Sequence, residues 1–391
     1  MTCLTLLLAT LLASDEGWRE LPSMTTPRQE VGVAGLDGKV YVIGGLLPGG
    51  AATGSAEVFN VTEERWDTIA PLPGGARLHH VGAAAVGGRV YAVGGLTNPF
   101  FNGVRTVSAY DPDSREWSPR EDLPTPRGAM GVATLDGKIY AAGGQGPGSV
   151  REFAVYDPAL DHWTSLPPLP SRRNHLTAVA LGGFFYTIGG RSSGLLGAVE
   201  RYEPSGSGDP EAGEFGTWES VAALPTPRAG IAAAVAQGRV YVFGGEGNNV
   251  SPNGIFDENE MFDPLTDRWF PRCPMPVGLH GIGAAEVDGV LYVAGGSDVR
   301  GFGVSTLVYA YTPPPVTTFA GDTNGDGELD LGDVGFLLLR TLFPPDDACT
   351  GNYEAADVNV DGARNLLDVI YLLDFLFRAG PPPRAAVPPE E

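Results

Sequence analysis

A glycine doublet preceded by a short apolar run recurs along most of the chain, and this repeat constrains the fold more than any other feature. The doublets are Gly44-Gly45, Gly94-Gly95, Gly143-Gly144, Gly189-Gly190, Gly244-Gly245 and Gly295-Gly296. An interval of roughly fifty residues is typical of repeats in which each unit is one small sheet. Because a lone four-stranded sheet cannot bury both faces, we expect the six units to stack radially.

The sequence of each repeat unit predicts four antiparallel strands. A two-residue turn containing Gly separates the first two, as at Asp37-Gly38, and such turns permit the positive φ angles of a tight hairpin. Farther along, an aromatic residue precedes a tryptophan, as Phe59 precedes Trp66. The sixth unit lacks its tryptophan, whereas Trp18 lies before the first unit. We therefore expect the N-terminal segment to supply the outer strand of the sixth blade and so close a ring.

The order of doublet, aromatic residue and tryptophan resembles kelch repeats from about Trp18 to Pro313. This resemblance implies an all-β six-bladed kelch β-propeller, which we assign to residues 15–312. The composition agrees, since 56 Gly and 34 Pro in 391 residues argue against a helical bundle. A net charge of −22 argues against a nucleic-acid partner, and no apolar run is long enough for a transmembrane anchor.

The first residues and the cysteines bear on the compartment. Residues 1–13 (MTCLTLLLATLLA) are apolar and precede Ser14-Asp15-Glu16, which is typical of a secretory signal peptide, although a mis-assigned start codon or an N-terminal strand gives the same pattern. The remaining thiols, Cys273 and Cys349, indicate neither a disulfide framework nor a zinc site.

A proline-rich linker, residues 313–319, leads to an acidic segment with two calcium loops of twelve residues each. Side-chain oxygens, with one backbone carbonyl at the seventh position, occur at the spacing that a Ca²⁺ loop requires. In the first loop these residues are Asp322, Asn324, Asp326, Glu328, Asp330 and Asp333. In the second they are Asp357, Asn359, Asp361, Ala363, Asn365 and Asp368. We expect two Ca²⁺ ions here.

Each calcium loop runs into an apolar helix with no incoming helix, and this duplicated arrangement resembles a type I dockerin domain. The resemblance covers residues 320–380, ahead of a Pro-rich tail at 381–391, and implies a small all-α calcium-binding domain. It also implies a cohesin-like partner, secretion and a link to polysaccharide degradation. Leu331-Gly332 and Leu366-Leu367 differ from the polar residues that help cellulosomal dockerins to select a cohesin.

Aligning the repeats on their doublets brings polar residues to one rim of the predicted ring. These candidate ligand-binding residues are Glu30, Arg77, His79, His80, Arg173, His175, Arg228 and His280. One interpretation is a polar cleft for a sugar or an acidic ligand. For the arginines the alternative is a structural role in the Pro-Arg framework of the repeat. For the histidines the alternatives are a rim without a ligand and a metal or catalytic site.

Two function classes remain open from the sequence. The first is a secreted binding or interaction protein, with carbohydrate as the candidate ligand of the propeller. The second is a carbohydrate-active enzyme, either sialic-acid-epimerase-like or galactose-oxidase-like, by analogy of fold. The sequence identifies no catalytic residue.

Overall fold

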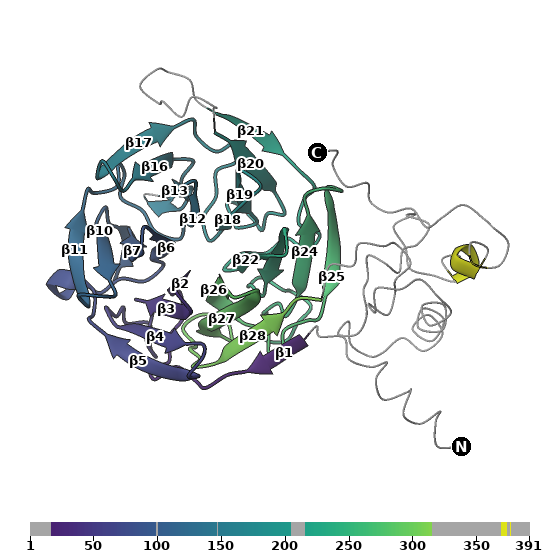
Figure 1. The fold of residues 1–391 in the computed structure, drawn as a ribbon, viewed down its shortest axis with the longest axis horizontal. Helices are drawn as coiled ribbons and strands as arrows, with labels where there is room; N and C mark the ends of the chain where they lie inside the picture. The colour runs from purple at the N-terminus through teal and green to yellow at the C-terminus, as the bar shows by residue number, and fades with distance from the viewer. Residues whose placement is uncertain are drawn as a thin grey trace.

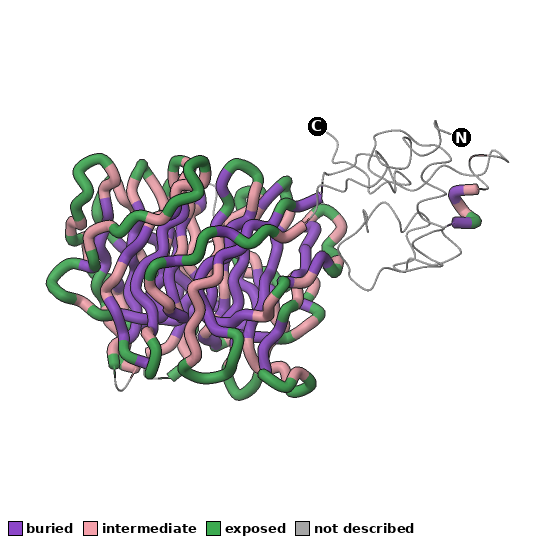
Figure 2. Tube along the Cα trace, turned by 90° about the horizontal axis from the view of Figure 1, so that it is seen from below, coloured by how far each residue is buried: buried purple, intermediate pink, exposed green. Residues whose placement is uncertain are grey.

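The chain forms a ring of small sheets around a central axis. The computed structural model describes residues 17–98, 101–146, 148–204, 216–314, 369–373 and 376. Within these residues, six four-stranded antiparallel sheets are arranged around a central axis (Figure 1). The first strand of each repeat lies nearest the axis, and the buried strands run between two rims of exposed turns (Figure 2). The expectation of a six-bladed, all-β propeller is therefore confirmed.

The strands of each blade follow one another in space from the axis outward. Blades 1 to 3 contain β2 (Gly32–Leu36), β3 (Lys39–Ile43), β4 (Ala56–Asn60), β5 (Arg65–Ile69); β6 (Gly82–Val86), β7 (Arg89–Val93), β10 (Val107–Asp111), β11 (Glu116–Arg120); and β12 (Gly131–Leu135), β13 (Lys138–Ala142), β16 (Phe153–Asp157), β17 (His162–Leu166). Blades 4 to 6 contain β18 (Thr177–Leu181), β19 (Phe184–Ile188), β20 (Val199–Glu203), β21 (Thr217–Ser220); β22 (Ala232–Ala236), β23 (Arg239–Phe243), β24 (Asn259–Asp263), β25 (Arg268–Arg272); and β26 (His280–Val287), β27 (Val290–Ser297), β28 (Val308–Thr312), β1 (Gly17–Glu20). Short elements in the connections are η1 (Pro73–Gly75), β8 (Leu96–Thr97), β9 (Asn102–Gly103), β14 (Gln145–Gly146) and β15 (Gly148–Ser149).

The glycine doublet is explained by the approach of the neighbouring blade. Gly44 has φ +63°, and a Cβ there would lie 2.5 Å from the carbonyl oxygen of Leu78 in the next blade. The backbone N–H of Gly45 donates to that same oxygen at 2.8 Å. The equivalent bond recurs at every blade, so the doublet joins neighbours by main-chain hydrogen bonds that a side chain would block.

The tryptophans join the blades at the outer edge. Each lies directly opposite an aromatic residue of its own blade, as Trp66 lies opposite Phe59. Each indole Nε1 also donates to a backbone carbonyl of the preceding blade at 2.7–3.0 Å. Between the blades, apolar side chains form six buried clusters, one at each interface. Most of the core therefore lies between sheets.

The N-terminal strand closes the ring. β1 pairs antiparallel with β28, which places Trp18 opposite Tyr311 and makes β1 the outer strand of blade 6. Trp18 Nε1 donates to the carbonyl oxygen of Cys273 in blade 5 at 2.8 Å. Cys273 itself is buried and disulfide-bonded, which the absence of a disulfide framework in the sequence did not predict.

The dockerin-like segment is described only in its last helix. Residues 369–373 and 376 are helical, and Val369 and Leu372 are buried. The two predicted calcium loops, 322–333 and 357–368, lie outside the described residues, as do the leader 1–13 and the tail 381–391. The all-α calcium-binding domain therefore stays a prediction. No helix in the described part of the chain is long and apolar enough to span a membrane.

Candidate functional site

A closed circle of backbone hydrogen bonds surrounds the axis at one mouth of the channel. One residue of each blade, near the start of the inner strand, donates its N–H to the carbonyl of the equivalent residue in the preceding blade at 2.7–3.0 Å. These axial residues are Glu30, His80, Ala129, His175, Gly230 and Gly281. All six have left-handed backbone angles, with φ between +51° and +64°. A side chain at such a position costs about 1–2 kcal/mol, which glycine avoids.

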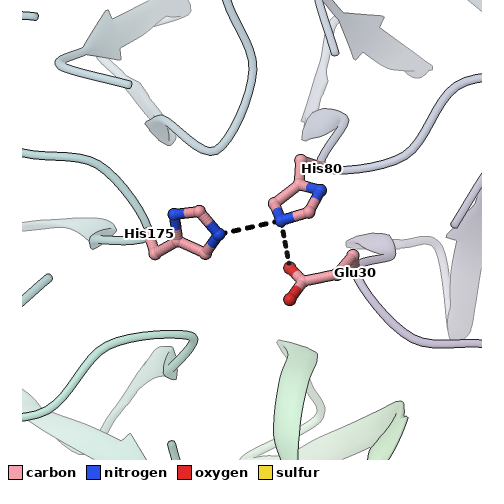
Figure 3. A group of neighbouring side chains, drawn as sticks. All are labelled: Glu30, His80 and His175. Atoms are coloured by element: carbon pink, nitrogen blue, oxygen red, sulfur yellow. Dashed lines mark hydrogen bonds and ion pairs between the residues drawn. The ribbon is translucent and has the colours of Figure 1, made fainter. Parts of the chain in front are cut away.

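Three of the six axial positions carry a side chain that can bind a ligand, and all three side chains meet on the axis (Figure 3). His80 Nε2 lies 3.0 Å from a carboxylate oxygen of Glu30 and 2.9 Å from Nε2 of His175. The three residues come from different blades, so their sequence separations carry no motif. Left-handed residues that are not glycine persist only where the surrounding structure holds them, and outside turns they cluster at functional sites.

The tautomer of His175 is determined by the residue before it. His175 Nδ1 lies 2.5 Å from Asn174 Oδ1. The amide of Asn174 is held in this orientation because its Nδ2 donates to Gln145 at 2.8 Å and to Ser149 at 2.6 Å. Since an amide oxygen only accepts, the proton is on Nδ1, and Nε2 of neutral His175 directs a lone pair at the axis.

His80 is supported from behind by a second histidine. The Nδ1 atoms of His79 and His80 are 2.5 Å apart, so one of them donates to the other. His79 is fully buried and packs edge-on against Phe101, with ring centroids 4.7 Å apart. Sequence reasoning placed His79 beside His80 on the rim, but the structure puts it beneath the surface, where it orients its neighbour.

The remaining polar groups continue around the axis through blades 4 to 6. Arg191 donates from Nη2 to His175 Nε2 at 2.9 Å and forms an ion pair with Glu246. The other oxygen of Glu246 lies 3.8 Å from His280 Nδ1. His280 Nε2 donates to the carbonyl of Val299 at 3.0 Å, so its Nδ1 is the atom directed at Glu246. Two carboxylates, Glu30 and Glu246, thus share the mouth with three imidazoles and one guanidinium group.

Burial and neighbouring charges set the protonation states of the cluster. Burial alone would raise the pKa of Glu30, but its interactions with His80, and secondarily with His175 and His280, hold that pKa well below the usual range. Burial lowers the pKa of His175 far below its ordinary value, and the repulsion from His80 lowers it further. Burial likewise lowers the pKa of His79 to about 3. At neutral pH an ionised Glu30 therefore faces a neutral His175.

The channel next to these side chains is small and lined mainly by small and aliphatic residues. A cavity of about 120 Å³ is lined by the axial residues and by the starts of the six inner strands, among them Val33, Val132 and Ala233. Farther along the same strands a wider cavity of about 420 Å³ is lined mainly by alanine, valine and glycine. The ionisable side chains that line the smaller cavity are thus Glu30, His80 and His175, and Glu286 lines the wider one.

The predicted rim arginines lie elsewhere. Arg173 and Arg228 are fully buried and pair with Glu200 and Glu260 of their own blades. Their guanidinium groups also donate to carbonyls of the second strand, as Arg228 does to Val242 at 3.0 Å. A ligand cannot reach side chains without exposed surface, so these two residues have the structural role that the repeat framework also allowed.

Arg77 is out of register with the buried arginines. In blade 2 the equivalent position is occupied by Leu78, whose carbonyl accepts the doublet bond of blade 1, and Arg77 precedes it on the surface. Arg77 therefore does not occupy the repeat position of the buried Arg173 and Arg228. In the described part of the chain, its side chain makes no contact with the axial residues.

Two residues of the site were missed by sequence reasoning. Arg191 and Glu246 each directly follow a doublet, and each forms a β-bridge with the residue just before the axial position of its blade. Asn174 and Ala229 are those bridge partners. The hairpin register on both sides of the doublet would have placed Arg191 and Glu246 beside the axis.

Comparisons with known proteins agree with the repeat pattern. The Kelch motif matches residues 27–73, 77–124, 126–170 and 227–276, which cover blades 1, 2, 3 and 5. Four of the six blades are therefore kelch repeats. The matched ranges leave out blades 4 and 6. In blade 4, residues 204–216 separate β20 from β21, and blade 6 is assembled from both ends of the ring.

Individual proteins are similar to this chain in sequence or in fold. Kelch-like protein terF of Aspergillus terreus is 29% identical over 318 residues, which cover 76% of this chain and 68% of that protein. Kelch-like ECH-associated protein 1B of Danio rerio is 37% identical over 84 residues, 21% of this chain and 14% of that protein. The solved structure of YjhT superimposes with a TM-score of 0.61 at 18% identity, covering 73% of this chain and 95% of that one. The last similarity shows the fold alone.

Proposed function

We propose that this chain is a binding protein whose kelch propeller takes a polar ligand, with carbohydrate as the class, at the channel mouth beside Glu30, His80 and His175. The observation that carries the proposal is the convergence of these three side chains on strained backbone positions around one axis. Glycine would hold the same backbone circle without strain, as Gly230 and Gly281 do. The retained side chains therefore point to a role in binding.

Carbohydrate suits the chemistry around the mouth. Sugar hydroxyls both donate and accept hydrogen bonds, and here the carboxylates of Glu30 and Glu246 lie beside imidazole and guanidinium groups. Sugar faces also stack on aromatic rings, which Phe101 beside His79 and the half-exposed Phe302 supply. A few convergent polar groups beside an apolar wall are typical of small-ligand sites.

The second candidate is an enzyme acting on the same class of ligand. The 3.0 Å contact between Glu30 and His80 pairs a carboxylate with an imidazole, and such a pair can move protons to and from a bound sugar. A glycan array on the full chain, followed by product analysis of each bound sugar, separates binding from turnover. Released or epimerised product would favour the enzyme.

The test of the site uses His80→Ala/His175→Ala, with the exposed His162→Ala as the matched control. We expect the double variant to lose glycan binding and His162→Ala to retain it, because His162 pairs with Glu121 on the outer part of blade 3. Unchanged binding by a folded double variant would refute the axial site.

For the C-terminal segment we propose a dockerin-like module that binds two Ca²⁺ ions and docks to a cohesin-like partner outside the cell. The duplicated loops at 322–333 and 357–368 support the proposal, and the apolar leader 1–13 supports export. N-terminal sequencing of the exported protein tests the leader. Calcium-dependent capture of a cohesin module tests the docking, and binding that persists in chelator would refute it.

A further inference from the structure

We propose that Glu30, His80 and His175 form a binding site for a divalent transition-metal ion such as Zn²⁺. The proposal goes beyond the binding of a polar ligand and does not depend on it. One ligand atom from each residue, Nε2 of each histidine and a carboxylate oxygen, lies within 4.8 Å of the other two. Among the described residues, these three side chains are the ones close enough to coordinate a single ion jointly.

The separations between the ligand atoms are close to those that a metal requires. The Nε2–Nε2 distance is 2.9 Å and the Nε2–carboxylate distance is 3.0 Å. Metal–ligand bonds of about 2.0–2.1 Å in tetrahedral geometry separate the ligand atoms by about 3.3–3.4 Å. An ion therefore needs these two separations to widen by only a few tenths of an ångström, whereas the ligand atoms of Glu30 and His175, which lie within 4.8 Å of each other, must reach the same spacing.

The proton inventory of the cluster also favours a cation. His80 Nε2 lies within hydrogen-bond distance of both Glu30 and His175 Nε2, and a single proton on it can serve one of these contacts. His175 contributes a lone pair at Nε2, because its proton is on Nδ1 facing Asn174, and this lone pair accepts a hydrogen bond from Arg191 Nη2. A divalent cation at the common point would satisfy the carboxylate and both lone pairs at once.

The groups behind the ligands are those that metal sites use. A ligating histidine usually donates its other ring N–H to a fixed acceptor, which holds the tautomer and the ring orientation. Asn174 is that acceptor for His175, and it is itself held by Gln145 and Ser149. His79 takes the corresponding place behind Nδ1 of His80.

The ligand set also limits which ion fits. Two imidazoles and one carboxylate suit Zn²⁺ and other first-row transition metals, whereas Ca²⁺ and Mg²⁺ prefer oxygen ligands throughout. Three protein ligands leave a coordination position for water or a bound molecule. Arg191 now donates to His175 Nε2, but its side chain is 38% exposed and paired with Glu246, so it can release the lone pair while keeping that ion pair.

The test is a Co²⁺ titration of the full chain followed by visible absorption, after chelator treatment and in excess Ca²⁺, which fills the proposed C-terminal loops. We expect one Co²⁺ per chain with the intense bands of a nitrogen-containing tetrahedral site, and displacement by Zn²⁺. Glu30→Gln, His80→Gln and His175→Gln should each abolish the bands, whereas the surface variant His162→Gln should retain them.

A graded variant keeps the proposal falsifiable if the ligand variants fold poorly. Asn174→Ala removes the acceptor behind His175 and should weaken Co²⁺ binding by about 10–100-fold. Absence of the bands in the wild-type protein, or their persistence in folded His80→Gln and His175→Gln, would overturn the site. Glycan binding that still depends on His80 and His175 in metal-free protein would leave the proposed function standing without the metal.

Discussion

Replacing Trp18 tests whether the ring depends on its closing strand. Trp18→Ala removes the hydrogen bond to the Cys273 carbonyl and the ring contacts with Phe243, Tyr309 and Tyr311, whose centroids lie 4.8–6.1 Å away. Loss of a core tryptophan costs about 3–5 kcal/mol. Trp18 is only partly buried, so we expect about 3 kcal/mol. For a domain of this size that lowers the melting temperature by roughly 6 °C.

Trp18→Phe separates the hydrogen bond from the packing. Phenylalanine keeps most of the aromatic contacts, and the Cys273 carbonyl still accepts a hydrogen bond from Asn259 Nδ2 at 3.0 Å. No carbonyl is left without a partner, so the expected loss is about 1 kcal/mol or less. The melting temperature should then fall by roughly 2 °C.

Trp117→Ala is the matched control away from the closure. Trp117 makes the same two kinds of contact, with the Ala70 carbonyl at 2.7 Å and with the ring of Tyr110. However, β11 is held to β10 by a short turn, whereas no turn joins β1 to β28. Scanning calorimetry and limited proteolysis should show one cooperative transition in both variants but early cleavage near Trp18 only in Trp18→Ala. An unchanged melting temperature, or detachment of β1 without loss of the ring, would refute the argument.

Three further predictions follow from single contacts. Arg228→Met should lower the free energy of urea unfolding by about 3–5 kcal/mol, because it leaves the Glu260 carboxylate buried without its partner. Arg228→Met/Glu260→Met should recover part of this loss. Equal stability of the wild type and the single variant would contradict the structural role of Arg228. Ala129→Gly should raise the free energy of urea unfolding by up to about 1 kcal/mol, because Ala129 has φ +51°. Gly230→Ala should lower it by about 1–2 kcal/mol. The reverse order of stabilities would contradict the strain at the axial positions. In calorimetry, Ca²⁺ at about 100 times its Kd should stabilise the C-terminal segment by about 2.7 kcal/mol per site. A C-terminal unfolding transition whose temperature a chelator leaves unchanged would exclude calcium at 322–333.

The axial site shows where sequence reasoning reached its limit. Alignment on the doublets placed His80 and His175 at one rim, because equivalent positions of a repeat occupy equivalent places in a ring. It could not separate them from Arg173 and Arg228, which are only two positions away in the repeat but whose side chains are buried in the blades. The side chains point in different directions two residues apart because the backbone of the axial residue is left-handed. A glycine in the sequence signals such a positive φ angle, whereas a histidine does not.

The sequence alone determined the number of blades, the hairpin turns and the role of Trp18, because these depend on local patterns that repeat in register. Asp37-Gly38 and its equivalents have the positive φ angles that their composition predicted. Only the tertiary structure decided which side chains meet, because Glu30, His80 and His175 come from three blades and approach one another only when the ring is closed. A circle of weak backbone bonds around the axis holds that arrangement, and no short stretch of chain contains it.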